Sequence, residues 1–158
     1  MATTTVSDVR WLTVEQQEHW RAFLVGTARL TEALGRQLEH DSDLSLSEYE
    51  VLVRLSEAPG RTLRMSLLAD ELAHSRSRVT HTVRRLEAAG LVRREACAAD
   101  GRGVNCTMTE AGYDLLRAAA PIHVAGVREH LIDLLDEHQI ETMRDVFVAV
   151  NAHMRTHR

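Results

Sequence analysis

The stretch SRSRVTHTVRRLEAAGLVRRE, residues 75–95, constrains the fold more than any other part of this chain. It carries six arginines, yet Val79, Val83 and Leu86 recur among them at helical spacing. At about 100° per residue, these three side chains fall within about 60° of one another on a helix. The stretch therefore predicts a helix with a narrow buried stripe and a polar outer face. Gly90, which adopts a left-handed conformation without strain, is expected to end it.

The polar face of this helix is a candidate DNA-binding surface. An α-helix fits the major groove of DNA, where Arg, Ser, Thr and His side chains contact base edges or phosphates. Because such a helix enters the groove by its N-terminal end, its first residues are best placed for bases, whereas Arg84 and Arg85 are better placed for the backbone. The candidate DNA-binding residues of the helix are Ser75, Arg76, Ser77, Arg78, Thr80, His81, Arg84 and Arg85.

A solvated charged face is the ordinary alternative, and the distribution of charge argues against it. The chain has a net charge of −4, and all 19 of its Lys and Arg residues are Arg. A GC-rich genome explains the preference for Arg over Lys. It does not explain why residues 74–108 hold seven arginines against three acidic residues. A local basic patch in an acidic chain indicates that this region binds a polyanion.

The part of the chain before this stretch predicts three helices. They should reach about residues 40, 57 and 73, with a short extended piece at 61–64 between the second and the third. Capping signals mark their expected starts. These signals are Thr13 with Gln16, Ser47 with Glu50 (flanked by Leu46 and Val51 as a hydrophobic staple), and Ser66.

Beyond Gly90, the pattern predicts a β-hairpin and two long helices. The strands are joined by a loop whose Asp-Gly pair favours a turn. The first of the helices starts at Thr109 and should run through Pro121 with a kink, because its apolar pattern resumes beyond the proline. The predicted ranges are 91–97 and 104–109 for the strands, and about 109–135 and 137–154 for the helices.

These elements describe a mainly α fold with a small β-hairpin wing, in which a winged helix-turn-helix lies between long terminal helices. We assign residues 44–108 to DNA binding, and residues 1–43 and 109–158 to dimerisation. The terminal helices carry apolar stripes that need a partner, and a second copy of the chain is the economical one. A homodimer is therefore expected, and a two-fold dimer should recognise a pseudo-palindromic operator.

The chain resembles the multiple-antibiotic-resistance regulator (MarR) family of bacterial transcription factors. The residues that carry the resemblance are LADELAHSRSRVTHTVRRLEAAGLVRRE, the wing sequence DGRG, and the TMTEAG that leads into the next helix. The resemblance covers nearly the whole chain, including the order and lengths of the elements. It implies the winged-helix fold, dimeric binding of double-stranded DNA, and control by a small phenolic ligand. A repressor that an effector releases from its operator is the expected function.

The wing supplies two further candidate residues. Arg102 at the hairpin tip suits a narrow A·T-rich minor groove, whose negative potential attracts arginine. A merely polar turn is the alternative interpretation. The family's D-x-R pattern implies that Asp100 orients Arg102 or hydrogen-bonds the turn, so its role is structural.

The two cysteines, Cys97 and Cys106, raise the question of a redox switch. If the hairpin is symmetric about residues 101–102, they face each other across the strands. Directly opposed strand cysteines form strained disulfides, however, and cytosolic thiols stay reduced. Alternation along the second strand also places Cys106 on the inward face. We expect a small buried hydrophobic residue rather than a redox pair.

An effector site is expected, by resemblance, where the dimerisation helices meet the winged unit. A cation and aromatic walls for a small aromatic or anionic effector are available near the N-terminus, although Trp20 and Phe23 would serve equally well as dimer core. The candidate effector-binding residues are Arg10, Trp11, His19, Trp20 and Phe23.

Nine histidines also raise the question of a metal site. Residues 39–43 (EHDSD), and His123 with Glu129 and His130, contain nitrogen and oxygen ligands of the kind that zinc binds. The two groups lie far apart in the sequence, and a Cys-x-x-Cys pair is missing. We expect no metal and no cofactor.

Catalysis is not expected, because the sequence lacks a Gly-x-Ser-x-Gly, His-Glu-x-x-His, phosphate-loop or dinucleotide-binding motif. An enzyme with an accessory winged helix and a winged helix that binds only proteins are the rival functions. The chain length argues against the first, and the basic helix with the wing arginine argues against the second. Without a signal-peptide start or a membrane-length apolar run, a cytoplasmic protein away from the membrane is expected.

Overall fold

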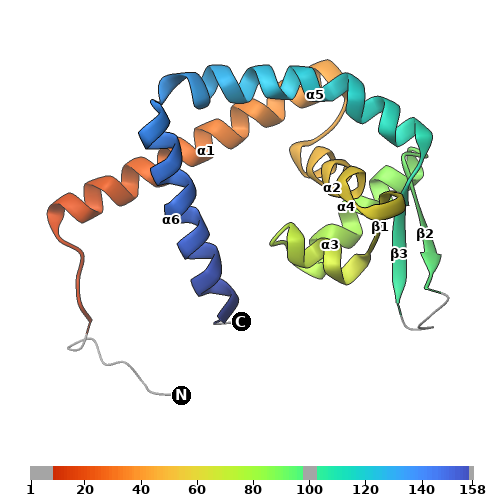
Figure 1. Ribbon diagram of the computed structural model, residues 1–158, viewed down its shortest axis with the longest axis horizontal. Coiled ribbons are helices and arrows are strands. Elements are labelled where there is room, and N and C mark those ends of the chain that lie inside the picture. Colours follow the sequence, from red (N-terminus) through yellow and green to blue (C-terminus); the bar gives the residue numbers. More distant parts are fainter. Residues whose placement is uncertain (1–8, 98–102, 157–158) are drawn as a thin grey trace.

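The computed structural model describes residues 9–97 and 103–156, and it has the predicted mainly helical architecture with a small sheet (Figure 1). In chain order the elements are α1 (Val14–Ser42), α2 (Leu46–Glu57), the 3-10 turn η2 (Pro59–Arg61), β1 (Thr62–Arg64), α3 (Met65–Glu71), α4 (Arg76–Ala88), β2 (Val92–Ala96), β3 (Val104–Met108), α5 (Glu110–His130), the 3-10 turn η3 (Ile132–Leu134) and α6 (Glu137–Thr156).

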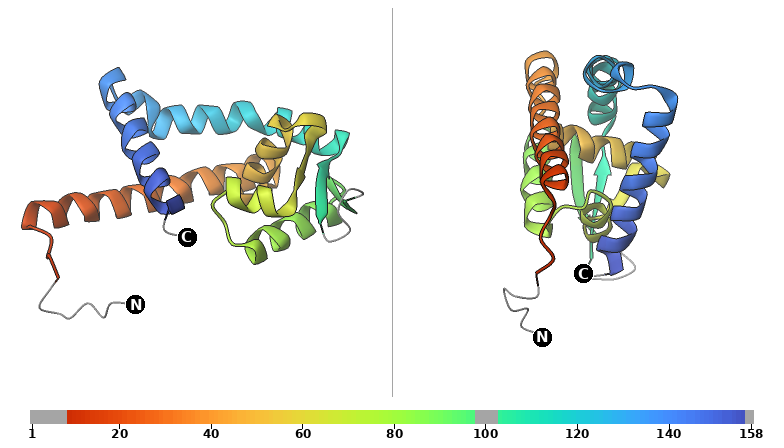
Figure 2. Two further views of the ribbon diagram at one scale, coloured as in Figure 1. Left: turned by 60° about the horizontal axis from the view of Figure 1, so that its bottom comes forward. Right: turned by 90° about the vertical axis from the view of Figure 1, so that its left-hand side faces the viewer.

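A winged unit, formed by residues 46–108, lies at one end of a pair of long helices. Helices α1 and α5 run side by side, and α6 turns back from the far end of α5 and crosses α1 (Figures 1 and 2). The winged unit combines α2, α3 and α4 with an antiparallel sheet of strand order β1-β3-β2. The β2–β3 hairpin projects from this unit as a wing (Figure 1).

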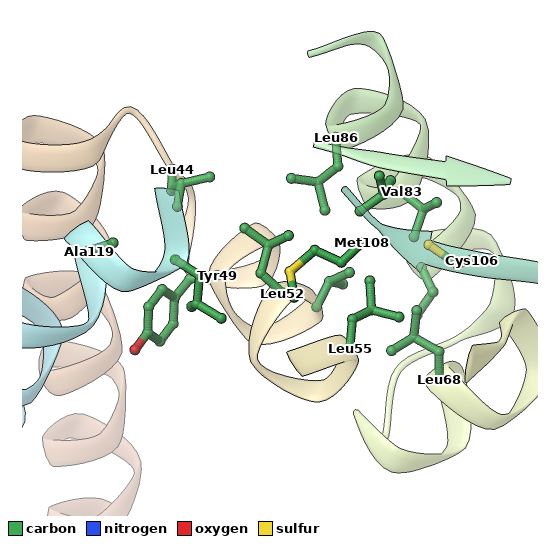
Figure 3. Packing of buried hydrophobic residues seen from close by; sticks show 14 of the residues in the cluster. Leu44, Tyr49, Leu52, Leu55, Leu68, Val83, Leu86, Cys106, Met108 and Ala119 are labelled. Carbon is green, nitrogen blue, oxygen red and sulfur yellow. The ribbon is translucent and has the colours of Figure 1, made fainter. Parts of the chain in front are cut away.

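The buried stripe predicted for α4 is confirmed. Val79, Val83 and Leu86 are each exposed by at most 1% and belong to the central hydrophobic cluster. Figure 3 shows part of this cluster, in which Leu52 and Leu55 of α2 lie beside the side chains of α4 and of strand β3. Burial of a side chain of this size contributes about 1.5–3 kcal/mol, so the stripe is what attaches α4 to the winged unit.

Two of the predicted helix starts are wrong by two residues. Helix α1 does begin with the Thr13–Gln16 capping box, but the box of α2 is Ser45 with Glu48 rather than Ser47 with Glu50. Both pairs have the spacing of a capping box, so local sequence does not separate them. The first pair is selected because it leaves Leu44 buried just before the helix. Helix α3 begins directly after β1, with Arg64 rather than Ser66 at its N-cap.

The hairpin register differs from the prediction by three residues. Arg94 stands opposite Cys106, and the amide of Cys97 donates to the carbonyl of Gly103 at 2.8 Å. The two cysteines therefore do not face each other, because Cys97 pairs with Gly103 and Cys106 pairs with Arg94. Cys106 points into the core as expected (Figure 3), and burial raises the pKa of its thiol to about 12.

The C-terminal helices follow the prediction with shifted ends. Helix α5 continues through Pro121, but it ends at His130, before the predicted end near residue 135, where η3 follows. Helix α6 extends to Thr156. In the part of the chain that the structure describes, no helix has the length and apolar character that crossing a bilayer requires.

The first turn of α5 packs so closely against the chain after α4 that position 112 must be a glycine. Thr109 caps the helix by accepting from the Gly112 amide at 3.1 Å, and its hydroxyl donates to the carbonyl of Gly90 at 2.8 Å. This double contact brings α5 close to the end of α4. A Cβ atom at position 112 would lie 2.1 Å from the carbonyl oxygen of Leu91, which is too close for any side chain.

We predict that Gly112→Ala destabilises the protein by about 1–3 kcal/mol, because the backbone of residue 91 must move. Gly35→Ala is the matched control, since it makes the same change inside α1 where nothing lies within 4 Å of the new methyl group. The control should stabilise by up to about 1 kcal/mol through helix propensity. Chemical denaturation followed by circular dichroism measures both, and equal effects at the two positions would contradict the assigned contact.

Candidate nucleic-acid interface

Helix α4 presents its predicted polar residues on one outward face. Ser75 is the N-cap and accepts from the amide of Arg78 at 3.3 Å, and Gly90, at φ 75°, lies just beyond the C-cap Ala89. Thr80 is half-buried and donates to the carbonyl of Arg76. The structure thus brings all eight predicted helix residues together, and the exposed ones are Ser75, Arg76, Ser77, Arg78, His81, Arg84 and Arg85.

Glu48 of α2 is a buried carboxylate that fixes α4 relative to α2. One of its oxygens accepts from the amide and the hydroxyl of Ser45, at 2.9 and 2.7 Å. The other forms an ion pair with Arg85, whose Nε lies 3.0 Å away, while the Glu48 side chain is only 7% exposed. A buried carboxylate requires such partners. Sequence analysis missed this residue, although the capping box that contains it was detectable.

Arg78 makes a second link between α4 and α2. Its guanidinium donates to the hydroxyl of Ser47 at 2.9 Å, so one end of the side chain is held at the start of α2 while the residue stays exposed. Arg78 and Arg85 therefore both contact α2 in this structure, one by a neutral hydrogen bond and one by an ion pair.

Arg94 joins the wing to α4. Its Nε and a terminal nitrogen donate to one oxygen of Glu87 at 2.9 and 2.6 Å, and its amide donates to the other oxygen at 3.0 Å. The hydrogen bond from the Arg94 side chain lowers the pKa of Glu87, so this carboxylate stays charged when the pH falls moderately. Arg94 thus links strand β2 to the last turn of α4, which is a structural role.

A cleft of about 390 Å³ separates the first half of α4 from the base of the wing. It also adjoins the junction between β1 and α3, which supplies residues that sequence analysis did not single out. Arg64 and Ser66 were assigned only to an extended piece and to a helix cap. A signal was present, because Arg64 is the last residue of the extended piece predicted at 61–64, which pairs with the wing strand β3. The lining residues are Arg64, Met65, Ser66, Arg76, Thr80, Gly103 and Val104.

The two wing candidates, Asp100 and Arg102, lie outside the described residues. The structure does place the base of the wing, where Cys97 and Gly103 are hydrogen-bonded to each other, beside this cleft.

The candidate effector residues are only partly brought together. His19, Trp20 and Phe23 line an apolar groove of about 680 Å³ between the first half of α1 and α6, whereas Arg10 and Trp11 lie apart from its lining. Trp20 stacks on Phe23 with ring centroids 5.6 Å apart, and Phe23 lies 5.8 Å from Phe147 of α6.

The candidate zinc ligands do not converge. Among residues 9–97 and 103–156, no three His, Cys, Asp or Glu side chains lie close enough together to hold a metal ion. His123 instead packs on the ring of Tyr49, with centroids 4.4 Å apart, and burial lowers its pKa.

Comparison with known proteins agrees with this geometry. The family model described as MarR family matches residues 42–103. The structure is similar to that of Sco3205, a MarR family transcriptional regulator from Streptomyces coelicolor in complex with DNA. The identity is 41%, with a TM-score of 0.88, over 90% of this chain and 89% of that one. AbsC, a MarR family transcriptional regulator of the same organism, is 40% identical, with a TM-score of 0.88, over 94% of this chain and 99% of that one. The chain belongs to the MarR family.

This membership makes the protein a transcriptional regulator rather than an enzyme. CouR from Rhodococcus jostii, whose structure contains p-coumaroyl-CoA, shares the MarR-family fold with a TM-score of 0.74. Its identity is 21%, over 89% of this chain and 96% of that one. Among curated proteins, none matches the chain significantly.

In this MarR-family regulator, we predict that Glu48→Ala destabilises the fold by about 1–3 kcal/mol. The change removes half of a capping box and leaves Ser45 without its acceptor. Glu57→Ala is the matched control, because Glu57 is in the same helix, 61% exposed and paired with Arg54. The control should change stability by less than about 0.5 kcal/mol. Urea denaturation of both variants measures this, and a loss for Glu48→Ala as small as that of the control would show that the buried carboxylate does not fix α4.

Proposed function

We propose that this MarR-family regulator is a homodimer that binds a pseudo-palindromic operator and represses transcription until a small effector releases it. The observation that carries the proposal is the division of α4 into two faces. Its apolar stripe is buried, while seven polar or charged residues between positions 75 and 85 are exposed. A helix of this kind can enter the major groove without losing its attachment to the fold.

We assign base contacts to the N-terminal half of α4 and backbone contacts to its second half and to the wing. Ser77 and His81 are exposed on the outer face. The presence of DNA in the Sco3205 structure supports DNA binding by a chain of this fold. Arg102, oriented by Asp100, is assigned to the minor groove. The remaining assigned contacts are Ser75, Arg76, Arg78, Thr80, Arg84 and Arg85.

The terminal helices support the dimer. Every residue of α6, and every residue of α1 from 14 to 33, remains exposed or half-exposed in the single chain. The exposed residues include large apolar side chains such as Trp20, Phe147 and Met154, which water solvates unfavourably. A second copy that covers them would place two α4 helices about a two-fold axis, which requires an operator with two similar halves.

The apolar groove between α1 and α6 also supports an effector site. Its volume of about 680 Å³ lies in the usual range of ligand sites, and His19 is a polar group on an otherwise mostly apolar lining. CouR supports the capacity of this fold to hold an aromatic acyl ester. We propose an aromatic effector bound by His19, Trp20 and Phe23, with Arg10 and Trp11 as outer contacts. Coverage of the whole groove by the second copy is the alternative.

For the DNA contacts, we predict that His81→Ala weakens binding to a duplex selected from a random-sequence pool by about 1–3 kcal/mol and narrows the difference from scrambled DNA. The reason is that base-edge contacts distinguish sequences. Arg117→Ala, which removes an exposed arginine on α5, should leave both affinities unchanged. Competition gel shifts measure the two ratios, and equal behaviour of the variants would remove His81 from the set of base contacts.

For the dimer, light scattering of the wild type should give a mass near twice 17.8 kDa. Phe147→Asp should shift this mass toward that of one chain, because it places a charge in the apolar groove. Arg144→Ala changes the same helix outside the groove lining and should leave the dimer intact. A monomeric wild type at micromolar concentration would refute the dimer.

A further inference from the structure

The cleft between α4 and the wing has the composition of an anion site. Arg64 and Arg76 bring two guanidinium groups to it, and Ser66 and Thr80 bring two hydroxyls. Among the described residues that line the cleft, none is acidic. Guanidinium groups bind phosphate through two parallel hydrogen bonds and keep their charge at any physiological pH.

Arg64 is held in this cleft by contacts at the base of the wing. It is the last residue of β1 and stands opposite Asn105 of β3. Its guanidinium donates to Sγ of Cys97 at 3.4 Å, so the side chain reaches across to the end of β2. A Cβ atom at position 103 would lie 3.1 Å from Cζ of Arg64, which means that the guanidinium passes close over the Gly103 backbone. The charge of Arg64 is therefore pre-positioned at the wing base.

The cleft lies where the backbone of a bound DNA strand is expected to pass. If α4 occupies the major groove and the wing reaches the adjacent minor groove, the sugar-phosphate strand between these grooves must pass between α4 and the wing. The cleft lies between these two elements. Any group that faces it meets backbone phosphate rather than base edges.

We infer that the cleft holds one backbone phosphate in each operator half, bound by Arg64 from the β1–α3 junction and Arg76 from α4. The inference rests on the proposed function. It reassigns Arg76 from base contact to backbone contact, and it adds a contact from outside the recognition helix and the wing tip. It also gives the second glycine of the DGRG sequence a role, because a side chain at position 103 would press on the Arg64 guanidinium.

A brace is the rival role for Arg64, in which the side chain only supports the wing through Cys97 and Gly103. The two roles predict different effects of Arg64→Ala on the salt dependence of DNA affinity and on the sensitivity of binding to a single phosphate. A lost phosphate contact lowers the log–log slope of affinity against salt by about 0.9 per protomer. Loss of a purely structural support weakens DNA binding but leaves the log–log slope of affinity against salt unchanged.

The test uses a duplex that the wild-type protein selects from a random-sequence pool, with methylphosphonate placed at one backbone position at a time. For the wild type, we expect one position in each half-site at which this neutral linkage weakens binding about tenfold or more, as expected for loss of a charged hydrogen bond. Arg64→Ala should be insensitive at that position, and its salt slope should be lower by about 0.9 per protomer.

Three further variants distinguish the effect of the Arg64 charge from the effect of its structural contacts at the wing base. Arg64→Lys should keep most of the salt slope and lose affinity, because it retains the charge without the planar fork. Cys97→Ala removes the sulfur contact, and Arg117→Ala removes an exposed arginine outside the cleft. Arg117→Ala should bind as the wild type does. Cys97→Ala removes one support of the Arg64 guanidinium and should lower the affinity, but it should keep the wild-type slope and the wild-type sensitivity to the neutral linkage.

Two results would overturn the inference, and they are distinguishable. If Arg64→Ala weakens binding but retains the full salt slope and the wild-type sensitivity at every position, Arg64 is a brace and the inference alone fails. If the wild type selects no duplex at all, the proposed DNA-binding function fails and the inference fails with it. Circular dichroism of Arg64→Ala, an exposed residue, checks that the variant is folded.

Discussion

The structure depends on the attachment of α4 through Val79, Val83 and Leu86. These three side chains are almost fully excluded from solvent, and they pack against α2 and the sheet. Much of the rest of the helix surface is polar or charged, so this stripe supplies most of the apolar burial that α4 contributes. Because the stripe is narrow, it leaves the opposite face open, and a surface that could bind DNA follows from the packing itself.

Polar contacts then determine how α4 is oriented rather than whether it is attached. Glu48 connects the start of α2 to Arg85, and Glu87 connects the end of α4 to Arg94 of the wing. Ion pairs of this kind add little net stability, but they have directional geometry and restrict the relative positions of three elements. The spacing between the helix and the wing, and with it the cleft at Arg64, is maintained by these contacts.

Much of this arrangement could be predicted from the sequence, because it depends on periodic burial. The limits of α4 follow from Ser75, the apolar stripe and Gly90, all of which act locally. The failures have a different cause. The capping box at Ser45 and the hairpin register depend on which alternative buries Leu44 before α2 and Val92 opposite Met108, and only the folded core decides this.

The candidate site was predicted incompletely for the same reason. The outward residues of α4 could be listed, but two arginines in the basic stretch, Arg85 and Arg94, pair with carboxylates that sequence analysis had not connected to them. Arg64 was missed because it joins the cleft through strand pairing with β3, a contact that spans some forty residues of chain. Likewise, Phe23, on which Trp20 stacks, meets Phe147 only after α6 turns back, and the groove formed in this way is not lined by Arg10 or Trp11.

In the proposed dimer, two copies of the chain present two α4 helices to two halves of one operator. A hydroxyl-radical footprint of the wild-type protein on a selected duplex tests this arrangement most directly. We expect two protected segments related by two-fold symmetry, with centres about one helical turn (~10 base pairs) or a small multiple apart. Protection of a single asymmetric segment at saturating protein would contradict it.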